Sequence, residues 1–187
     1  MNILHTSLSN VVIIEPDVYQ DGRGFFLETY HRRKYIEAGI PLTFVQDNYS
    51  RSAQGILRGL HTQVQHPQGK LIRVSQGEVF DVAVDIRRGS PTFAQWVGVT
   101  LTGENFKQIY IPPGFAHGFC VMSELADVEY KCTEFYDPTD ELAIHWHDSD
   151  ISITWPLSEP ILSQKDQSAR SLHEHMERLP IFQETCV

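Results

Sequence analysis

The stretch GILRGLHTQVQHPQGKLIRV, residues 55–74, sets ionisable side chains in an otherwise apolar frame. Arg58, His61 and Lys70 supply two cations and one imidazole. Charged groups are seldom buried in a strand unless they meet a partner. An imidazole, with an unperturbed pKa near ~6.5, can act as a base at neutral pH, and ammonium or guanidinium groups can neutralise an anion. The pattern therefore favours a site for one anionic small molecule.

A second polar position interrupts the apolar stretch IYIPPGFAHGFCVM, residues 109–122. By strand parity, His117 faces the same side as Phe115 and Phe119. A histidine among aromatic rings can line a ligand site. The alternative is a core histidine whose ring is satisfied by a backbone carbonyl.

Arg58 lies three positions before His61, and on a flat strand an odd spacing would place the two side chains on opposite faces. His61 shares its face with Gln63. Gly59 lies between the two ionisable residues and could host a β-bulge that turns Arg58 toward His61. The sequence leaves both arrangements open.

Short β-type runs separated by turn residues dominate the chain, at about the 8–12-residue spacing of a barrel or sandwich. We therefore predict an all-β fold, a jelly-roll barrel with short flanking helices and room for one ligand inside. A helix is expected over residues 31–40, ended by Gly39 and Pro41, and a short one within residues 165–179.

Turn residues also predict two hairpins, at SQGE (residues 75–78) and at LTGEN (residues 101–105). No Gly-, Ser- or Pro-rich linker divides the chain. We expect one domain over residues 1–187, with a core at about residues 10–166 and a tail at residues 167–187.

The composition limits the kinds of molecule that the chain can bind and the compartment in which it is expected. The chain has 187 residues and a formal net charge of -9, which argues against general binding to nucleic acid or to an anionic membrane. Three cysteines, Cys120, Cys132 and Cys186, form no C-x-x-C pair and favour a reducing compartment. The start, MNILHTSLSNVV, has no signal-peptide pattern, and no apolar run is long enough to span a membrane. A cytoplasmic protein is expected.

Two short motifs resemble those of the cupin superfamily. Pro112, Gly114 and His117 match the second cupin motif, P-x-G-x-x-H. The first motif of metal-binding cupins, H-x-H followed by Glu, is not kept: Gln63 follows His61, and the Glu position falls on a proline or a glutamine. A metal site usually needs at least three protein ligands, so no metal is expected.

Two further histidine pairs invite a metal interpretation. His145 and His147 have H-x-H spacing and would point to one face of a strand, but no third ligand is evident, so exposure to solvent is the stronger expectation. His173 and His175 do not share a helix face well and are interpreted as tail residues.

Over about residues 10–166 the chain closely resembles the dTDP-4-dehydrorhamnose 3,5-epimerase family. Several matching segments are long and stand in the family's order, which makes the resemblance far more specific than a single cupin motif. The matching segments are DGRGFFLE (21–28), QDNYSRS (46–52), GILRGLH (55–61), GKLIRVSQGEVFDVAVDIRRGSPT (69–92), IPPGFAHGF (111–119), EYKCTEFYDPTDE (129–141) and WPLSEPILSQKD (155–166).

The resemblance implies a dTDP-4-keto-6-deoxy sugar as substrate and epimerisation at C3 and C5, without a cofactor. Loss of a proton next to the C4 ketone gives an enolate, so a base, a proton donor on the other face and a cation at the oxygen are needed. The resemblance implies His61 as base, oriented by Asp166, with Lys70 as the cation and Tyr130 as the donor. Tyr136 is a rival donor.

The resemblance also implies a set of substrate-binding residues. Two of them, Arg23 and Glu28, could serve the site of a partner subunit, so a homodimer is expected. On sequence alone, the turn that holds Arg23 could equally be an ordinary surface turn. The full set is Arg23, Glu28, Gln46, Asn48, Arg58, Lys70, His117, Glu141 and Lys165.

Three other functions fit parts of the pattern. A single-position epimerase of a related dTDP-4-keto-deoxysugar would use the same base, lysine and tyrosine. A metal-dependent cupin oxygenase or isomerase would bind metal at His61 and His117. A non-catalytic sugar-nucleotide or carbohydrate-binding barrel would need neither base nor proton donor.

Overall fold

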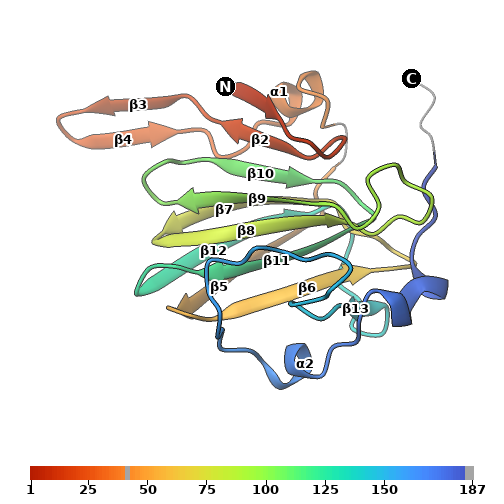
Figure 1. The fold of residues 1–187 in the computed structure, drawn as a ribbon. Coiled ribbons are helices and arrows are strands. Elements are labelled where there is room, and N and C mark those ends of the chain that lie inside the picture. Colours follow the sequence, from red (N-terminus) through yellow and green to blue (C-terminus); the bar gives the residue numbers. More distant parts are fainter. Residues whose placement is uncertain (41–42, 184–187) are drawn as a thin grey trace.

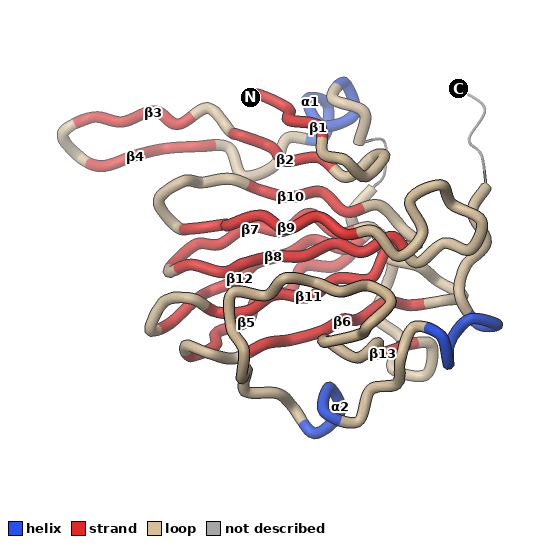
Figure 2. Tube along the Cα trace, in the orientation of Figure 1, coloured by secondary structure: helices blue, strands red, loops and turns tan. Residues whose placement is uncertain are grey.

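The computed structural model describes residues 1–40 and 43–183, which form two antiparallel sheets and a separate hairpin (Figures 1 and 2). The larger sheet has the order β1 (Asn2–His5), β2 (Val12–Glu15), β10 (Gln108–Ile111), β7 (Lys70–Gln76), β12 (Leu125–Cys132) and β5 (Gln46–Ala53). The smaller sheet has the order β13 (Glu141–Ala143), β6 (Leu57–Gln63), β11 (Phe115–Val121), β8 (Glu78–Asp85) and β9 (Trp96–Thr102). The hairpin pairs β3 (Val18–Asp21) with β4 (Gly24–Leu27).

Successive strands alternate between the two sheets along most of the chain. From β5 to β8, and again from β9 to β12, each strand belongs to the sheet opposite that of its predecessor. This alternation is the jelly-roll arrangement, so the predicted all-β jelly-roll fold is confirmed.

Both predicted hairpins are wrong for the same reason. Residues 75–78 carry the chain from β7 across to the facing sheet, and residues 101–105 lie at the end of β9 before the chain crosses back to β10. Gly77 has φ +77°, and a Cβ at this position would fall 2.0 Å from the Leu125 carbonyl oxygen. A glycine therefore marks a tight corner here, as it would mark a hairpin, and only the pairing of the flanking strands separates the two.

The inward faces of the strands change from apolar to polar along their length. Ile72 and Val74 of β7 pack with Val128 of β12 in the core between the sheets. At the other end of the same faces stand Lys70 of β7 and, partly buried against the core, Tyr130 of β12. Because side chains alternate with a period of two, a strand that buries apolar residues at one end presents polar residues to the same interior at the other.

A β-bulge in β6 decides where Arg58 points. His117 of β11 lies opposite His61, and Phe119 lies opposite Arg58, so three steps along β6 match two along β11. Gly59 has φ +122°, and a Cβ at this position would fall 2.5 Å from the Cα of Gly118. The positive φ and the close approach of the two strands each require glycine at this position. The bulge brings Arg58 and His61 to the same interior, as the open alternative from the sequence allowed.

The helices are short and lie outside the sheets. Helix α1 (Arg32–Glu37) confirms the prediction for residues 31–40, whereas Pro41 lies outside the described residues. The tail contains α2 (Gln164–Gln167) and a separate 3-10 helix, η1 (His173–Arg178), in place of one helix. No helix in residues 1–40 and 43–183 is long and apolar enough to cross a membrane.

Three smaller expectations are settled by the packing. Strand β13 ends at Ala143, so His145 and His147 lie in the following turn and do not share a strand face. His175 is buried and hydrogen-bonds the Ala143 carbonyl at 3.1 Å, so it is not merely a tail residue. Cys120 and Cys132 are buried free thiols, and Cys186 lies outside the described residues.

Candidate active site

A cavity of about 440 Å³ opens between the two sheets, and we call it the main cavity. A side cavity of about 320 Å³ adjoins it. His61, Lys70 and Tyr130 line both cavities. Lys70 and Tyr130 come from the larger sheet and His61 from the smaller sheet, so these groups reach the interior from opposite walls.

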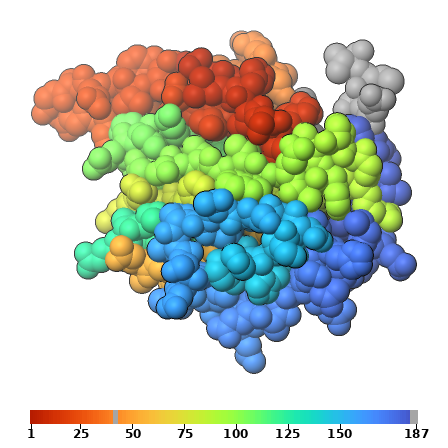
Figure 3. All heavy atoms as spheres, viewed as in Figure 1, coloured from red at the N-terminus to blue at the C-terminus, as the bar shows by residue number. Residues whose placement is uncertain are grey.

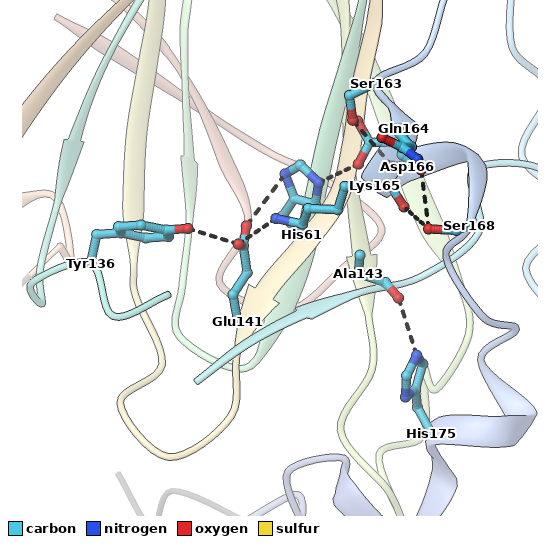
Figure 4. Close-up of polar contacts among 10 residues, drawn as sticks. All are labelled: His61, Tyr136, Glu141, Ala143, Ser163, Gln164, Lys165, Asp166, Ser168 and His175. Carbon is cyan, nitrogen blue, oxygen red and sulfur yellow. Dashed lines mark hydrogen bonds and ion pairs between the residues drawn. The ribbon is translucent and has the colours of Figure 1, made fainter. Parts of the chain in front are cut away.

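His61 is bound to a buried carboxylate. Its Nε2 lies 2.6 Å from Oδ1 of Asp166, which is 2% exposed (Figure 4). The Nε2–H donates to the carboxylate, and this leaves Nδ1 with its lone pair free in the neutral ring. Burial alone would raise the pKa of Asp166, but the hydrogen bond and charge of His61, with help from Ser163, hold that pKa below its ordinary value.

The tail positions Asp166 although it lies far from His61 in sequence. The backbone N–H of Leu57 donates to the Ile161 carbonyl at 3.0 Å, which fastens the tail alongside β6. Ser163 caps helix α2: its hydroxyl accepts the backbone N–H of Asp166 at 3.1 Å and donates to Asp166 Oδ2 at 2.9 Å. Capping therefore fixes the carboxylate at the start of the helix.

Lys70 is a half-buried cation without a near carboxylate. Among the described residues, no carboxylate oxygen lies within 4.0 Å of its ammonium nitrogen. Burial lowers the pKa of Lys70 below its ordinary value, because the charged form loses hydration there. Such an ammonium group can stabilise an anion that forms in the cavity.

Two tyrosines stand near the cavities. Tyr130 lines both cavities and is partly buried, and burial raises the pKa of its phenol, which keeps the phenol protonated. Tyr136 lines the side cavity, is half exposed, and donates its hydroxyl to Glu141 Oε2 at 2.8 Å. The geometry favours Tyr130 as the group that faces His61 across the interior.

His117 is also held by a carboxylate, which the sequence analysis missed. Its Nε2 lies 2.8 Å from Asp81 Oδ2, so the interpretation that a backbone carbonyl satisfies this ring is wrong. Asp81 stands fully buried in the apolar strand β8, and that unusual setting was the available signal. Arg58 lines the same cavity as His117, and its Nε donates to Ser52 Oγ at 3.0 Å.

The remaining predicted binding residues divide into two groups. Gln46, Asn48 and Glu141 line the side cavity, and Lys165 lines the main cavity. In the part of the chain that the structure describes, Arg23 and Glu28 lie outside both cavities. Arg23 pairs with Asp21 at the tip of the β3–β4 hairpin, and Glu28 pairs with Lys34.

No group of three or more His, Cys, Asp or Glu residues within residues 1–40 and 43–183 is arranged to hold a metal ion. The ring nitrogens Nε2 of His61 and His117 are each engaged by an aspartate. The expectation of a metal-free site stays a prediction.

An alternating two-sheet barrel with ionisable groups converging in its interior defines a cupin-type jelly-roll enzyme. Within that class, the chain belongs to the dTDP-4-dehydrorhamnose 3,5-epimerase family, whose model matches residues 5–174. The family is therefore an isomerase family, and the resemblance inferred from the sequence is confirmed.

Named relatives cover nearly the whole chain. A dTDP-4-dehydrorhamnose 3,5-epimerase from Pseudomonas aeruginosa is 53% identical over 91% of this chain and 96% of its own length. A dTDP-6-deoxy-D-glucose-3,5-epimerase from Legionella pneumophila, solved with dTDP-4-keto-L-rhamnose, has a TM-score of 0.95 and 55% identity over 97% of this chain and 98% of that one. A dTDP-4-dehydrorhamnose 3-epimerase from Streptomyces niveus is 39% identical over 93% of this chain and 85% of its own length.

Proposed function

We propose that this chain is a dTDP-4-dehydrorhamnose 3,5-epimerase, which inverts C3 and C5 of dTDP-4-dehydro-6-deoxy-D-glucose in dTDP-L-rhamnose biosynthesis. The observation that carries the proposal is the pair of opposed walls. A carboxylate-bound imidazole stands on one wall, and a half-buried ammonium group and a protonated phenol stand on the other. The sugar nucleotide bound to the Legionella pneumophila relative supports the choice of substrate.

The proposed mechanism follows from the positions of these groups. His61 Nδ1 takes the proton from the carbon next to the C4 ketone, and the bonding electrons move to O4 as an enolate. Lys70 stabilises that oxyanion, a role worth about 10²–10³ in rate at comparable sites. Tyr130 then delivers its phenolic proton to the opposite face of the same carbon, which inverts it.

The remaining wall residues suit the charged part of the substrate. Arg58 and Lys165 are cations in the main cavity and can contact phosphate oxygens, as the guanidinium fork does well. Gln46 and Asn48 line the side cavity, where their amides can meet polar groups of the nucleotide. We propose that the chain acts without cofactor or metal, as one epimerase domain over residues 1–187, in the cytoplasm.

Proton NMR of the protein with the 4-keto sugar nucleotide in deuterated water tests the function. A double epimerase exchanges hydrogen at both C3 and C5, whereas a single-position epimerase exchanges one of them. A non-catalytic binder leaves both carbons unexchanged. Metal analysis of the same protein addresses the remaining class, since stoichiometric metal required for turnover would favour a metal-dependent cupin.

Tyr130→Phe is expected to separate proton removal from inversion. Without the phenolic proton, His61 can still abstract and return a proton on its own face, so exchange persists while inversion falls by about 10²–10⁴-fold. The measurement is NMR integration of exchanged against inverted product. If Tyr136→Phe shows this behaviour instead and Tyr130→Phe does not, the donor is Tyr136.

We also propose a homodimer in which the β3–β4 hairpin brings Arg23 and Glu28 to the partner's cavity. The hairpin projects from the body of the chain and carries Phe25 and Phe26 with most of their surface exposed (Figure 3). Such an apolar projection favours burial against another subunit. This arrangement explains why two binding residues implied by the family lie away from the cavities of their own chain.

Co-expression of two inactive variants tests this crossing. If Arg23 serves the partner, chains carrying Arg23→Ala and chains carrying His61→Ala form mixed dimers with one intact site. For random pairing, about one quarter of parent activity returns. If Arg23 serves its own chain, no intact site forms and the mixture stays inactive. Sedimentation equilibrium of the parent should give twice the 21.4 kDa chain mass.

A further inference from the structure

If the chain inverts two carbons, as proposed above, His61 must give up a proton between the two inversions. The role inferred for Glu141 below rests on that proposed function. Each inversion breaks one C–H bond and leaves its proton on His61, while Tyr130 gives up another. A second abstraction on the same bound sugar requires a neutral imidazole again. His61 must therefore lose its proton between the two events.

Asp166 is a poor exit for that proton. It already accepts Nε2–H of His61 and a hydroxyl from Ser163, and it is almost entirely enclosed. The abstracted proton arrives on the other ring nitrogen, Nδ1, because Nε2 already carries one. Among the described residues, the carboxylate nearest to Nδ1 is that of Glu141, whose Oε1 lies 3.9 Å away.

Glu141 connects the interior to the surface. It stands on β13, which pairs with β6 so that Ala143 lies opposite His61. Its side chain is only 14% exposed, yet its Oε2 is held by the hydroxyl of Tyr136 and the ammonium group of Lys165, which are about half exposed (Figure 4). Glu141 therefore has one oxygen toward the base and the other toward groups at the solvent boundary.

We propose that Glu141 receives the abstracted proton from His61 Nδ1 and passes it to solvent, which resets the base for the second inversion. The N–H bond at Nδ1 breaks, an O–H bond forms at Glu141 Oε1, and the carboxylic acid releases the proton to water. Solvent then returns one proton to Tyr130, so the balance closes. At 3.9 Å, one bridging water or a small rotation of Glu141 completes the transfer.

The lowered pKa of Glu141 suits a group that accepts a proton and then releases it. Burial pushes the pKa of Glu141 up, but hydrogen bonds from Lys165 and Tyr136 and the charge of His61 outweigh it and hold that pKa below its ordinary value. The carboxylate is thus ionised and ready to accept, and it releases the proton quickly. Glu141 acts through His61 and not on the sugar carbons.

Glu141→Gln tests the relay, since glutamine keeps the size and can still accept a hydrogen bond from Tyr136 but cannot carry a proton. With the sugar nucleotide in deuterated water, we expect the rate of the second inversion relative to the first to fall by about tenfold or more. Singly inverted sugar should accumulate. A small diffusible buffer such as formate, added at rising concentration, should restore the second inversion. Glu141→Asp should lie between the variant and the parent.

Glu134→Gln, which removes a half-buried carboxylate from the neighbouring loop, is the matched control and should behave like the parent. The relay is overturned if Glu141→Gln slows both inversions equally, raises KM and does not respond to buffer, because that result describes substrate binding alone. It is also overturned if Glu141→Gln inverts both carbons at parent rates. If the parent itself exchanges only one carbon or none, the proposed double epimerisation fails, and that failure is visible without any variant.

Discussion

His61→Ala should abolish hydrogen exchange at both C3 and C5, with turnover lower by about 10³–10⁴-fold. The same imidazole serves both carbons in the proposed mechanism, so the two exchange rates must fall together. His117 of the neighbouring strand β11 also lines the main cavity, with its Nε2 hydrogen-bonded to Asp81 of β8, so the variant also tests whether this second imidazole can act as a base. NMR in deuterated water reports both carbons in one experiment.

His147→Ala is the matched control for this variant, since His147 is an exposed histidine in the turn after β13. It should exchange and invert both carbons as the parent does. Thermal unfolding should show that His61→Ala keeps the fold. Residual exchange near the parent rate at either carbon would remove His61 as the base for that carbon.

Lys70→Met should lower turnover by about 10²–10³-fold while the variant remains folded. Methionine fills the space of the aliphatic stem but offers no charge to the enolate oxygen. Removing a partly desolvated charge that lacks a near carboxylate relieves its desolvation, so the free energy of unfolding should not fall. Turnover and denaturant unfolding together measure the two effects.

The pH dependence gives an independent check on Lys70. Burial lowers its pKa, so turnover of the parent should decline with rising pH before the usual lysine value of about 10.4 is reached. The folded state binds fewer protons than the unfolded state in that interval, so this residue's contribution to stability rises with pH as its contribution to activity falls. Lys70→Met should lack both effects. An unchanged alkaline limb in the variant would assign that limb to another group.

Much of the fold was predictable from local patterns. Alternating apolar residues and frequent turn residues sufficed for an all-β jelly roll, and the helix at residues 31–40 followed from its own segment. The hairpins at residues 75–78 and 101–105 were wrong because a corner that crosses between sheets uses the same turn residues. The choice depends on which distant strands pair, and β7 pairs with β10 and β12.

Some residues of the candidate site were predictable from the sequence, and others were not. His61, Lys70 and His117 were apparent as ionisable residues in apolar strands, because burying such groups without a partner is costly. Asp166 was connected to His61 only by the family resemblance, since 105 residues separate them and the tail carries no spacing signal. Asp81 was missed, although a carboxylate in a buried strand was a visible anomaly.

The sequence by itself determined the residue types, the face on which each stands wherever a strand is regular, and the family to which the chain belongs. The face on which a residue stands follows from its own strand, because side chains alternate along it. The family follows from many matching segments taken together. Only the tertiary structure decided that Gly59 forms a bulge, that Asp166 reaches His61 Nε2, and that Glu141 lies beside Nδ1. These contacts join segments that meet only when the two sheets close over each other, and no local pattern encodes the distance between them.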